Sequence, residues 1–86
     1  MPSASVTELF SEHQRLLSEL PDGVTEADYQ TARWRRSRPR QQKDPAQDAM
    51  MFTVLTLREI RSDIRELGTE PPQLPPALKW LDRAEG

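Results

Sequence analysis

The chain has 86 residues, of which 35% are hydrophobic and 30% are charged, with a net charge of −2 and no cysteine. This length fits one small domain whose core leaves little room for a catalytic cleft. The lack of cysteine excludes disulfides, thiolate catalysis and cysteine-ligated zinc. No apolar run reaches the roughly 18 residues of a membrane span, and the first twenty residues lack the basic start of a signal peptide. We therefore expect a cytoplasmic protein without a membrane segment.

The charges are unevenly distributed along the chain. Six of the twelve basic side chains fall between positions 33 and 43, a stretch that contains no acidic residue. The rest of the chain carries six basic and fourteen acidic side chains, a balance of −8. The sequence therefore indicates an acidic body with one basic segment.

The first predicted helix covers residues 6–20. Ser5 and Glu8 form a capping box at its start, and Pro21 with Gly23 ends it. Positions three or four residues apart form its apolar stripe: Val6, Phe10, His13, Leu17 and Leu20. This spacing is typical of an amphipathic helix.

The second predicted helix spans residues 26–36 and presents a thin apolar face. Thr25 and Asp28 form a weaker capping pair at its start, and Pro39 disfavours helical backbone at the residue before it. Residues 37–43 are predicted to be a polar linker.

The third predicted helix spans residues 45–67 and is the spine of the fold. Asp44 is a suitable N-cap, and proline is favoured at the first helical position, where Pro45 stands. An apolar stripe continues as far as Gly68: Ala46, Met50, Thr53, Leu57, Ile60, Ile64 and Leu67. We expect Leu57 and Ile60 to lie in the core.

The charges beside the 57–67 part of this stripe are sorted by sign. At about 100° per residue, the basic side chains lie on one flank and the acidic ones on the other. The basic side chains are Arg58, Arg61 and Arg65. The acidic side chains are Glu59, Asp63 and Glu66. Such a seam favours a parallel neighbour, which is either the helix at 6–20 or a second copy of this helix. A homodimer through this seam is one partner hypothesis.

Residues 69–86 are predicted to be a proline-rich arm with a short helix that begins at Pro76. The run PPQLPP at positions 71–76 is typical of extended, polyproline-like backbone. The arm carries Trp80, for which two interpretations stay open. Either Trp80 anchors a protein partner, or the arm folds back and covers the third helix with it.

The sequence offers no catalytic constellation. His13 is the only histidine, and it has no Ser, Cys or acidic partner at a recognisable spacing, so we expect a semi-buried packing residue. Acidic pairs one turn apart, such as Glu59 and Asp63, are typical of a charged surface and do not by themselves predict a metal site. Three glycines leave no phosphate-binding loop. We therefore expect no enzyme activity, no cofactor and no metal.

The segment at positions 33–40 is the strongest binding candidate. Together with Trp80, its basic and aromatic side chains are the predicted partner-binding residues: Arg33, Trp34, Arg35, Arg36, Arg38 and Arg40. They fit an acidic surface on a protein partner, a nucleic acid, or an ordinary solvated or intramolecular role. The acidic balance elsewhere disfavours nucleic acid.

The predicted fold is all-α, in a single domain covering residues 1–86. It is a small three-helix packing, with a helical hairpin and a long third helix, followed by the proline-rich arm and a short terminal helix. The leading functional hypothesis is a small helical protein-binding regulator, inhibitor, chaperone or accessory subunit. It would act through an apolar helical face and the arginine-rich segment. The alternative is a small nucleic-acid-binding regulator that uses residues Arg33 to Arg40.

Overall fold

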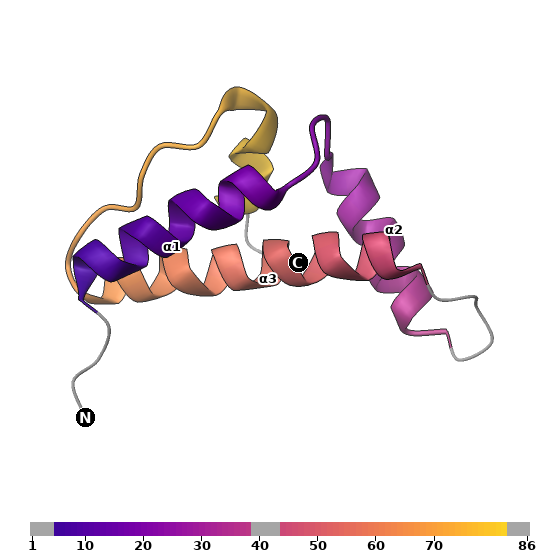
Figure 1. The fold of residues 1–86 in the computed structure, drawn as a ribbon, viewed down its shortest axis with the longest axis horizontal. Helices are drawn as coiled ribbons and strands as arrows, with labels where there is room; N and C mark the ends of the chain where they lie inside the picture. The colour runs from indigo at the N-terminus through magenta and orange to yellow at the C-terminus, as the bar shows by residue number, and fades with distance from the viewer. Residues whose placement is uncertain (1–4, 39–43, 83–86) are drawn as a thin grey trace.

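The structure is a computed structural model that describes residues 5–38 and 44–82. In chain order, it contains the helices α1 (Val6–Glu19), α2 (Glu26–Arg36) and α3 (Pro45–Glu66) and the 3₁₀ helix η1 (Pro76–Asp82). Neither described range contains a strand. The prediction of an all-α fold is confirmed, because the described elements are all helices. The predicted three-helix packing is confirmed as well, because α3 packs against α1, α2 and η1 (Figure 1). The predicted linker covers residues 37–43. Of these, residues 39–43 lie outside the described residues, and they include the predicted binding residue Arg40.

Side-chain caps explain where the three α-helices begin. The Ser5 hydroxyl accepts a 3.2 Å hydrogen bond from the Glu8 N–H at the start of α1. Thr25 and Asp28 form a reciprocal capping box at the start of α2. The Asp44 carboxylate accepts from two backbone N–H groups in the first turn of α3. These caps satisfy N–H groups that have no partner within the helix.

Two backbone constraints explain where α1 and α3 end. Leu20 is extended, with φ −69° and ψ 134°, because the residue before Pro21 is disfavoured in helical backbone. After α3, Gly68 takes the left-handed φ of +82° that glycine tolerates best. The Gly68 N–H donates to the Arg65 carbonyl, and the Thr69 N–H donates to the carbonyl of the residue just before Arg65. This pattern is a Schellman motif, which turns the chain into the arm.

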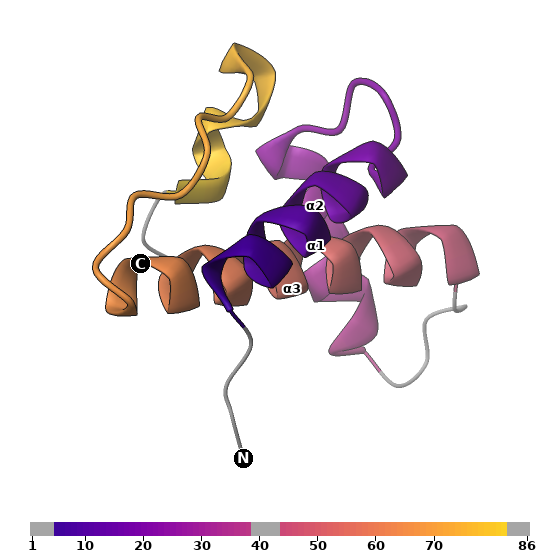
Figure 2. The same ribbon diagram turned by 60° about the vertical axis from the view of Figure 1, so that its left-hand side comes forward.

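α3 lies at the centre of the molecule and carries α1 and α2 on different parts of its length. Figures 1 and 2 show α1 over the C-terminal half of α3 and α2 across its N-terminal half. α1 and α3 run in roughly opposite directions, so the prediction that α1 is the parallel neighbour of α3 is wrong (Figure 1). The physical reason is that α2 crosses α3 instead of returning alongside it. In addition, Arg61 from the basic flank is buried inside the chain.

The core forms where α3 meets the elements around it. Its buried hydrophobic side chains come from all four helices and from the loops: Leu16, Leu20, Val24, Tyr29, Ala32, Met50, Met51, Val54, Leu57, Ile60, Ile64, Leu74, Trp80 and Leu81. The predicted core positions Leu57 and Ile60 are 0% and 7% exposed, which confirms that expectation.

The seam predicted on α3 is mostly covered within the chain itself. Leu57, Ile60 and Ile64 are buried, whereas Leu67 at the C-cap is 50% exposed. These buried side chains offer no surface to a second copy while the chain is folded.

We expect Ile60→Asp to unfold the protein. The substitution removes a buried aliphatic side chain and places an unpaired carboxylate in the core, which together cost several kcal/mol. Thermal unfolding followed by circular dichroism measures the effect, with Leu67→Asp at the half-exposed C-cap of α3 as the control. A melting temperature for Ile60→Asp close to that of the control would contradict the packing described here.

Candidate functional site

The arginine-rich segment forms the C-terminal end of α2. Cations in the last turn of a helix interact favourably with its dipole, and Arg33, Arg35 and Arg36 lie in that turn. Ser37 caps the helix: its N–H donates to the Arg33 carbonyl at 3.1 Å, and its hydroxyl donates to the Trp34 carbonyl at 2.8 Å. The cap fixes the backbone from which these arginine side chains extend.

Arg36 connects the end of α2 to α3. Its guanidinium carbon lies 4.8 Å from the centroid of the Phe52 ring, a cation–π contact, and its Nη1 lies 3.4 Å from an Asp48 carboxylate oxygen. The Phe52 side chain is nevertheless 47% exposed, and Leu55, one turn further along α3, is 40% exposed. We refer to Arg36, Phe52 and Leu55 as the Phe52 surface.

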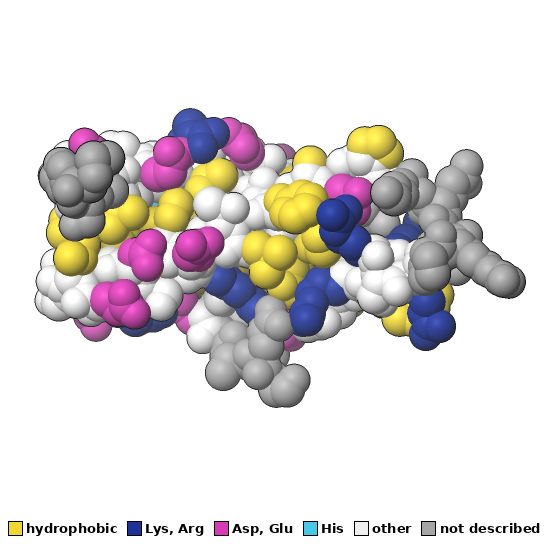
Figure 3. All heavy atoms as spheres, turned by 90° about the horizontal axis from the view of Figure 1, so that it is seen from below, with side chains coloured by type: hydrophobic (Ala, Val, Ile, Leu, Met, Phe, Trp, Pro, Cys, Tyr) yellow, Lys and Arg dark blue, Asp and Glu magenta, His cyan; other side chains and the backbone are white. Residues whose placement is uncertain are grey.

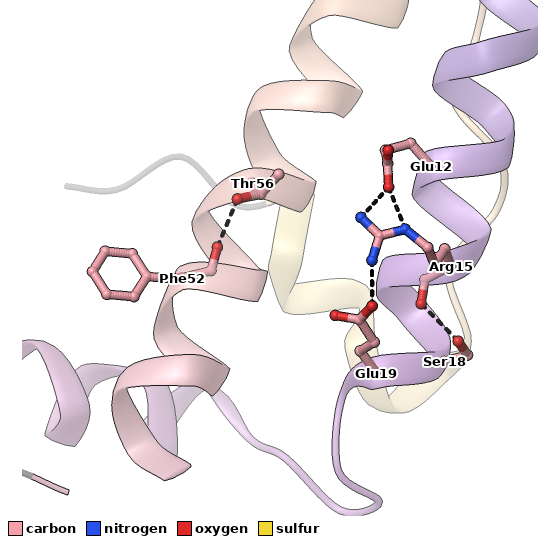
Figure 4. A network of polar contacts seen from close by, with 6 residues as sticks. All are labelled: Glu12, Arg15, Ser18, Glu19, Phe52 and Thr56. Atoms are coloured by element: carbon pink, nitrogen blue, oxygen red, sulfur yellow. Dashed lines mark hydrogen bonds and ion pairs between the residues drawn. The ribbon is translucent and has the colours of Figure 1, made fainter. Parts of the chain in front are cut away.

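Figure 3 shows the molecule from below. Hydrophobic side chains lie beside lysine or arginine side chains near the middle of the view, and acidic side chains gather towards its left. Figure 4 shows that Phe52 points away from α3 on the side opposite the Glu12–Arg15–Glu19 ion-pair network of α1. The Phe52 surface is therefore separate from the charged network of α1.

The predicted binding residues do not all come together. Trp34, 48% exposed, lies beneath the guanidinium of Arg38, whose central carbon is 4.9 Å from its ring. Trp34 and Arg36 are two residues apart on α2, about 200° around the helix axis, so they leave the helix on nearly opposite sides. The Trp34–Arg38 pair is thus a second exposed cluster, distinct from the Phe52 surface.

The two other described arginines of the segment differ in their surroundings. Arg33 lies over the ring of Tyr29, with its guanidinium carbon 5.7 Å from the centroid. Arg35 is exposed, and the structure gives its side chain no hydrogen bond or ion pair within residues 5–38 and 44–82. Arg35 is accordingly free to meet a binding partner.

Trp80 lies in the core and is not exposed as a partner anchor. It is 8% exposed and stacks on Tyr29 of α2, with ring centroids 5.9 Å apart and planes at 29°. Of the two interpretations of the arm, the structure shows the one in which the arm folds back and packs against the helices.

A buried polar network holds the arm, and sequence reasoning missed it. Arg61 is 3% exposed and forms two bonds to the Asp82 carboxylate, Nε to Oδ1 at 2.6 Å and Nη2 to Oδ2 at 2.8 Å. Its Nη1 also donates to the Pro72 carbonyl and to His13 Nε2, both at 2.8 Å. Arg65 adds a 3.0 Å ion pair to Asp82. One arginine of α3 therefore links α1, the extended arm and η1.

The network determines the protonation of His13. Arginine only donates hydrogen bonds, so His13 Nε2 accepts and the neutral ring carries its proton on Nδ1. Burial, together with the positive charge of Arg61, lowers the pKa of His13 from its usual 6.5, although Asp82 opposes this shift. Hydrogen bonds from Arg61 and Arg65 lower the pKa of Asp82 below its usual 3.8, despite partial burial.

We expect the protein to lose stability as the pH falls below about 6.5, the unfolded pKa of histidine. The lowered pKa of His13 means that the unfolded chain binds more protons than the folded one in this range, so stability decreases with acidification. The contribution of Asp82 is lost in a separate, more acidic range, as the pH falls below its usual pKa of 3.8 towards the lowered pKa of the folded state.

Urea unfolding between pH 7.5 and 5 measures this dependence. His13→Gln is the matched control, because its amide oxygen can accept from Arg61 without titrating. An equal slope in the two proteins would show that His13 does not titrate as described.

The structure also has a small apolar groove of about 280 Å³ between the end of α1, the loop after it and η1. Its lining is mostly hydrophobic: Leu17, Leu20, Pro21, Asp22, Gly23, Val24, Pro75, Ala77 and Leu78. Within the described part of the chain, no group of three His, Cys, Asp or Glu residues could hold a metal ion. None of the helices in the described residues has the length and hydropathy of a membrane span.

The Phe52 surface is the main guide to function, because comparisons with known proteins give none. The chain matches no protein-family model, no curated protein and no solved structure.

Proposed function

We propose that this chain is a small non-enzymatic protein-binding regulator or accessory subunit of the cytoplasm that docks a partner on the Phe52 surface. The observation that supports the proposal is the pair of half-exposed apolar side chains, Phe52 and Leu55, with Arg36 stacked on the aromatic ring. Aromatic residues and arginine are enriched among the residues that dominate binding energy in protein interfaces.

The charges around the surface favour a partner with an acidic rim. Arg36 is held in place by the Phe52 ring, so little side-chain entropy is lost when it binds a carboxylate. Arg35, in the same helical turn, adds a second guanidinium that is free for binding. A partner with an apolar centre and acidic residues at its edge would match both features.

We expect Arg35→Ala combined with Arg36→Ala to weaken binding to the natural partner about tenfold or more while the fold stays nearly intact. Exposed substitutions away from caps and core usually change stability by about 0.5 kcal/mol or less, and the exposed Arg36–Asp48 pair adds little. A tenfold loss of affinity requires only about 1.4 kcal/mol from the two arginines.

Co-purification of the native protein from its source identifies the partner, and calorimetric titration then compares the variants. Arg15→Ala is the matched control, because Arg15 is an exposed arginine of α1 that lies away from Phe52 (Figure 4). If the double variant melts far below wild type, the arginines are structural. If it binds as tightly as wild type, the Phe52 surface is not the interface.

The Trp34–Arg38 cluster supports the second candidate, a nucleic-acid-binding regulator. An exposed tryptophan beside a guanidinium can stack on an unpaired base while the arginine contacts a phosphate. This candidate predicts oligonucleotide binding that weakens steeply with salt and is lost in Trp34→Ala. Retention of the native protein partner by Trp34→Ala would favour the first candidate.

A further inference from the structure

The exposed face of α3 changes character along its length. Its N-terminal half carries Phe52 and Leu55, and its C-terminal half carries the exposed acids Glu59, Asp63 and Glu66. At about 100° per residue, all three acids lie within roughly 40° of Phe52 around the helix axis. The acidic half is thus a continuation of the same face.

The opposite charge lies at the other end of this face. Arg36 covers the Phe52 ring at 4.8 Å, and the remaining arginines of the last turn of α2 extend from the same end of the molecule. In Figure 3 most of the acidic side chains lie towards the left of the view and most of the basic ones near the middle and right, although an acidic side chain also lies beside a basic one right of the middle. The face therefore has a basic end, an apolar centre and an acidic end.

Such a face is complementary to itself when one copy is turned by 180°. We propose that the Phe52 surface binds a second copy of this chain, with the two α3 helices antiparallel across a twofold axis. The inference rests on the proposed function, since it names the partner of the same surface. In a twofold dimer each charge contact occurs twice, so the basic end of each copy meets the acidic end of the other.

The spacing along α3 gives the register. Glu59 lies seven residues after Phe52, which is about two turns or ~10.5 Å. Placing Glu59 of one copy opposite Phe52 of the other brings it to Arg36, which already lies on that ring. The twofold axis then passes between Leu55 and Thr56, so the apolar side chains lie at the centre of the interface.

This register also places Asp63 opposite Asp48 of the second copy. Asp48 is held by Arg36 at 3.4 Å, so one guanidinium lies close to both carboxylates and offsets their repulsion. A parallel arrangement would instead bring Glu59 against Glu59 and each acidic half against its own copy. Like charges facing each other across an interface are costly, so the antiparallel arrangement is favoured.

Sedimentation equilibrium of the full chain tests the proposal. We expect wild type to dimerise reversibly, and Arg36→Glu and Glu59→Arg each to weaken the dimer about tenfold or more, because each reversal acts at two symmetric contacts. Glu19→Arg is the matched control, because it makes the same charge change on α1, away from Phe52 (Figure 4). Circular dichroism of each variant verifies that it is folded.

Mixing the two reversed variants tests the register. In the mixed dimer, Glu at position 36 of one copy faces Arg at position 59 of the other, and the second contact keeps the wild-type pair of Arg36 with Glu59. Both contacts are then between opposite charges, so we expect affinity to return towards that of wild type. A monomer at every concentration up to the millimolar range would overturn the proposal. A dimer insensitive to both reversals would also overturn it, and failure of the mixture to recover would overturn the antiparallel register.

A cross-link provides a measurement that does not depend on charge. The chain has no cysteine, so Thr56→Cys introduces a single thiol directly beside the proposed axis. We expect a disulfide-linked dimer to form readily on mild oxidation, and much more slowly in the control Ser18→Cys on α1. Equal cross-linking of the two variants would contradict the twofold axis at this place.

The same variants separate this inference from the proposed function. If wild type is monomeric but Arg36→Glu loses a native partner, the surface binds another protein and the self-association is wrong. If the charge-swapped mixture dimerises but no other protein co-purifies, the self-association stands and the accessory role is wrong.

Discussion

Trp80→Ala should destabilise the protein by about 3–5 kcal/mol, whereas Trp34→Ala should change its stability by about 0.5 kcal/mol or less. Trp80 is 8% exposed and stacks on Tyr29, so its removal leaves a cavity between η1 and α2. Trp34 is 48% exposed, and its main contact is with the side chain of Arg38. A small domain of marginal stability cannot lose several kcal/mol without partial unfolding at room temperature.

Urea unfolding of both variants, followed by circular dichroism at 222 nm, measures the difference. The comparison is well matched, because the chain has two tryptophans and the substitutions remove the same atoms. Similar unfolding midpoints would show that the arm contributes no more to stability than an exposed side chain. In that case Trp80 would again be available as a partner anchor.

Local signals in the sequence were sufficient for the helices. The caps at Ser5, Thr25 and Asp44 and the stops at Pro21 and Gly68 act within a few residues, so each can be identified without knowing the fold. How α1, α2 and α3 pack depends on contacts between residues far apart. The flanking charges of α3 predicted a parallel neighbour, and the observed antiparallel one shows that exposed charges are weak guides to packing.

Arg61 shows why the buried network could not be predicted in the same way. The observed buried stripe of α3 runs through Val54, Leu57 and Ile64, and Arg61 lies within it at the same spacing of three and four residues. A hydropathy pattern assigns a charged residue to the surface. The residue that makes burial of Arg61 acceptable is Asp82, 21 residues later in an arm whose path no local signal indicates.

The Phe52 surface was only partly predictable for a related reason. Composition drew attention to the arginines, and the sequence placed Arg36 and Trp34 in one segment. The structure separates them, because the helical turn sends Arg36 towards Phe52 and Trp34 away from it. The signal that could have identified the surface was a Phe on the polar side of the α3 pattern, between Asp48 and Glu59.

Replacing Asp82 should cost more than replacing Arg61, although the two form one ion pair. Asp82→Ala leaves the Arg61 side chain, which is 4% exposed, without its counter-charge, and breaking a buried pair in this way costs about 3 kcal/mol or more. Arg61→Met removes the buried charge itself and fills part of its space. The Asp82 carboxylate, 36% exposed, then keeps Arg65 and solvent, so we expect a loss of about 2 kcal/mol from the unpaired His13 nitrogen and Pro72 carbonyl.

The double variant gives the decisive comparison. Once Asp82 is gone, replacing Arg61 by Met removes the uncompensated charge, so Arg61→Met should raise the stability of the Asp82→Ala protein while lowering that of wild type. Urea unfolding of wild type, the two single variants and the double variant measures this coupling. Additive losses would mean that Arg61 reaches solvent and that the arm is held by its buried apolar side chains alone. A gain in the double variant would show that the Arg61–Asp82 pair fixes where the arm packs, because the buried charge of Arg61 is not tolerated there without Asp82.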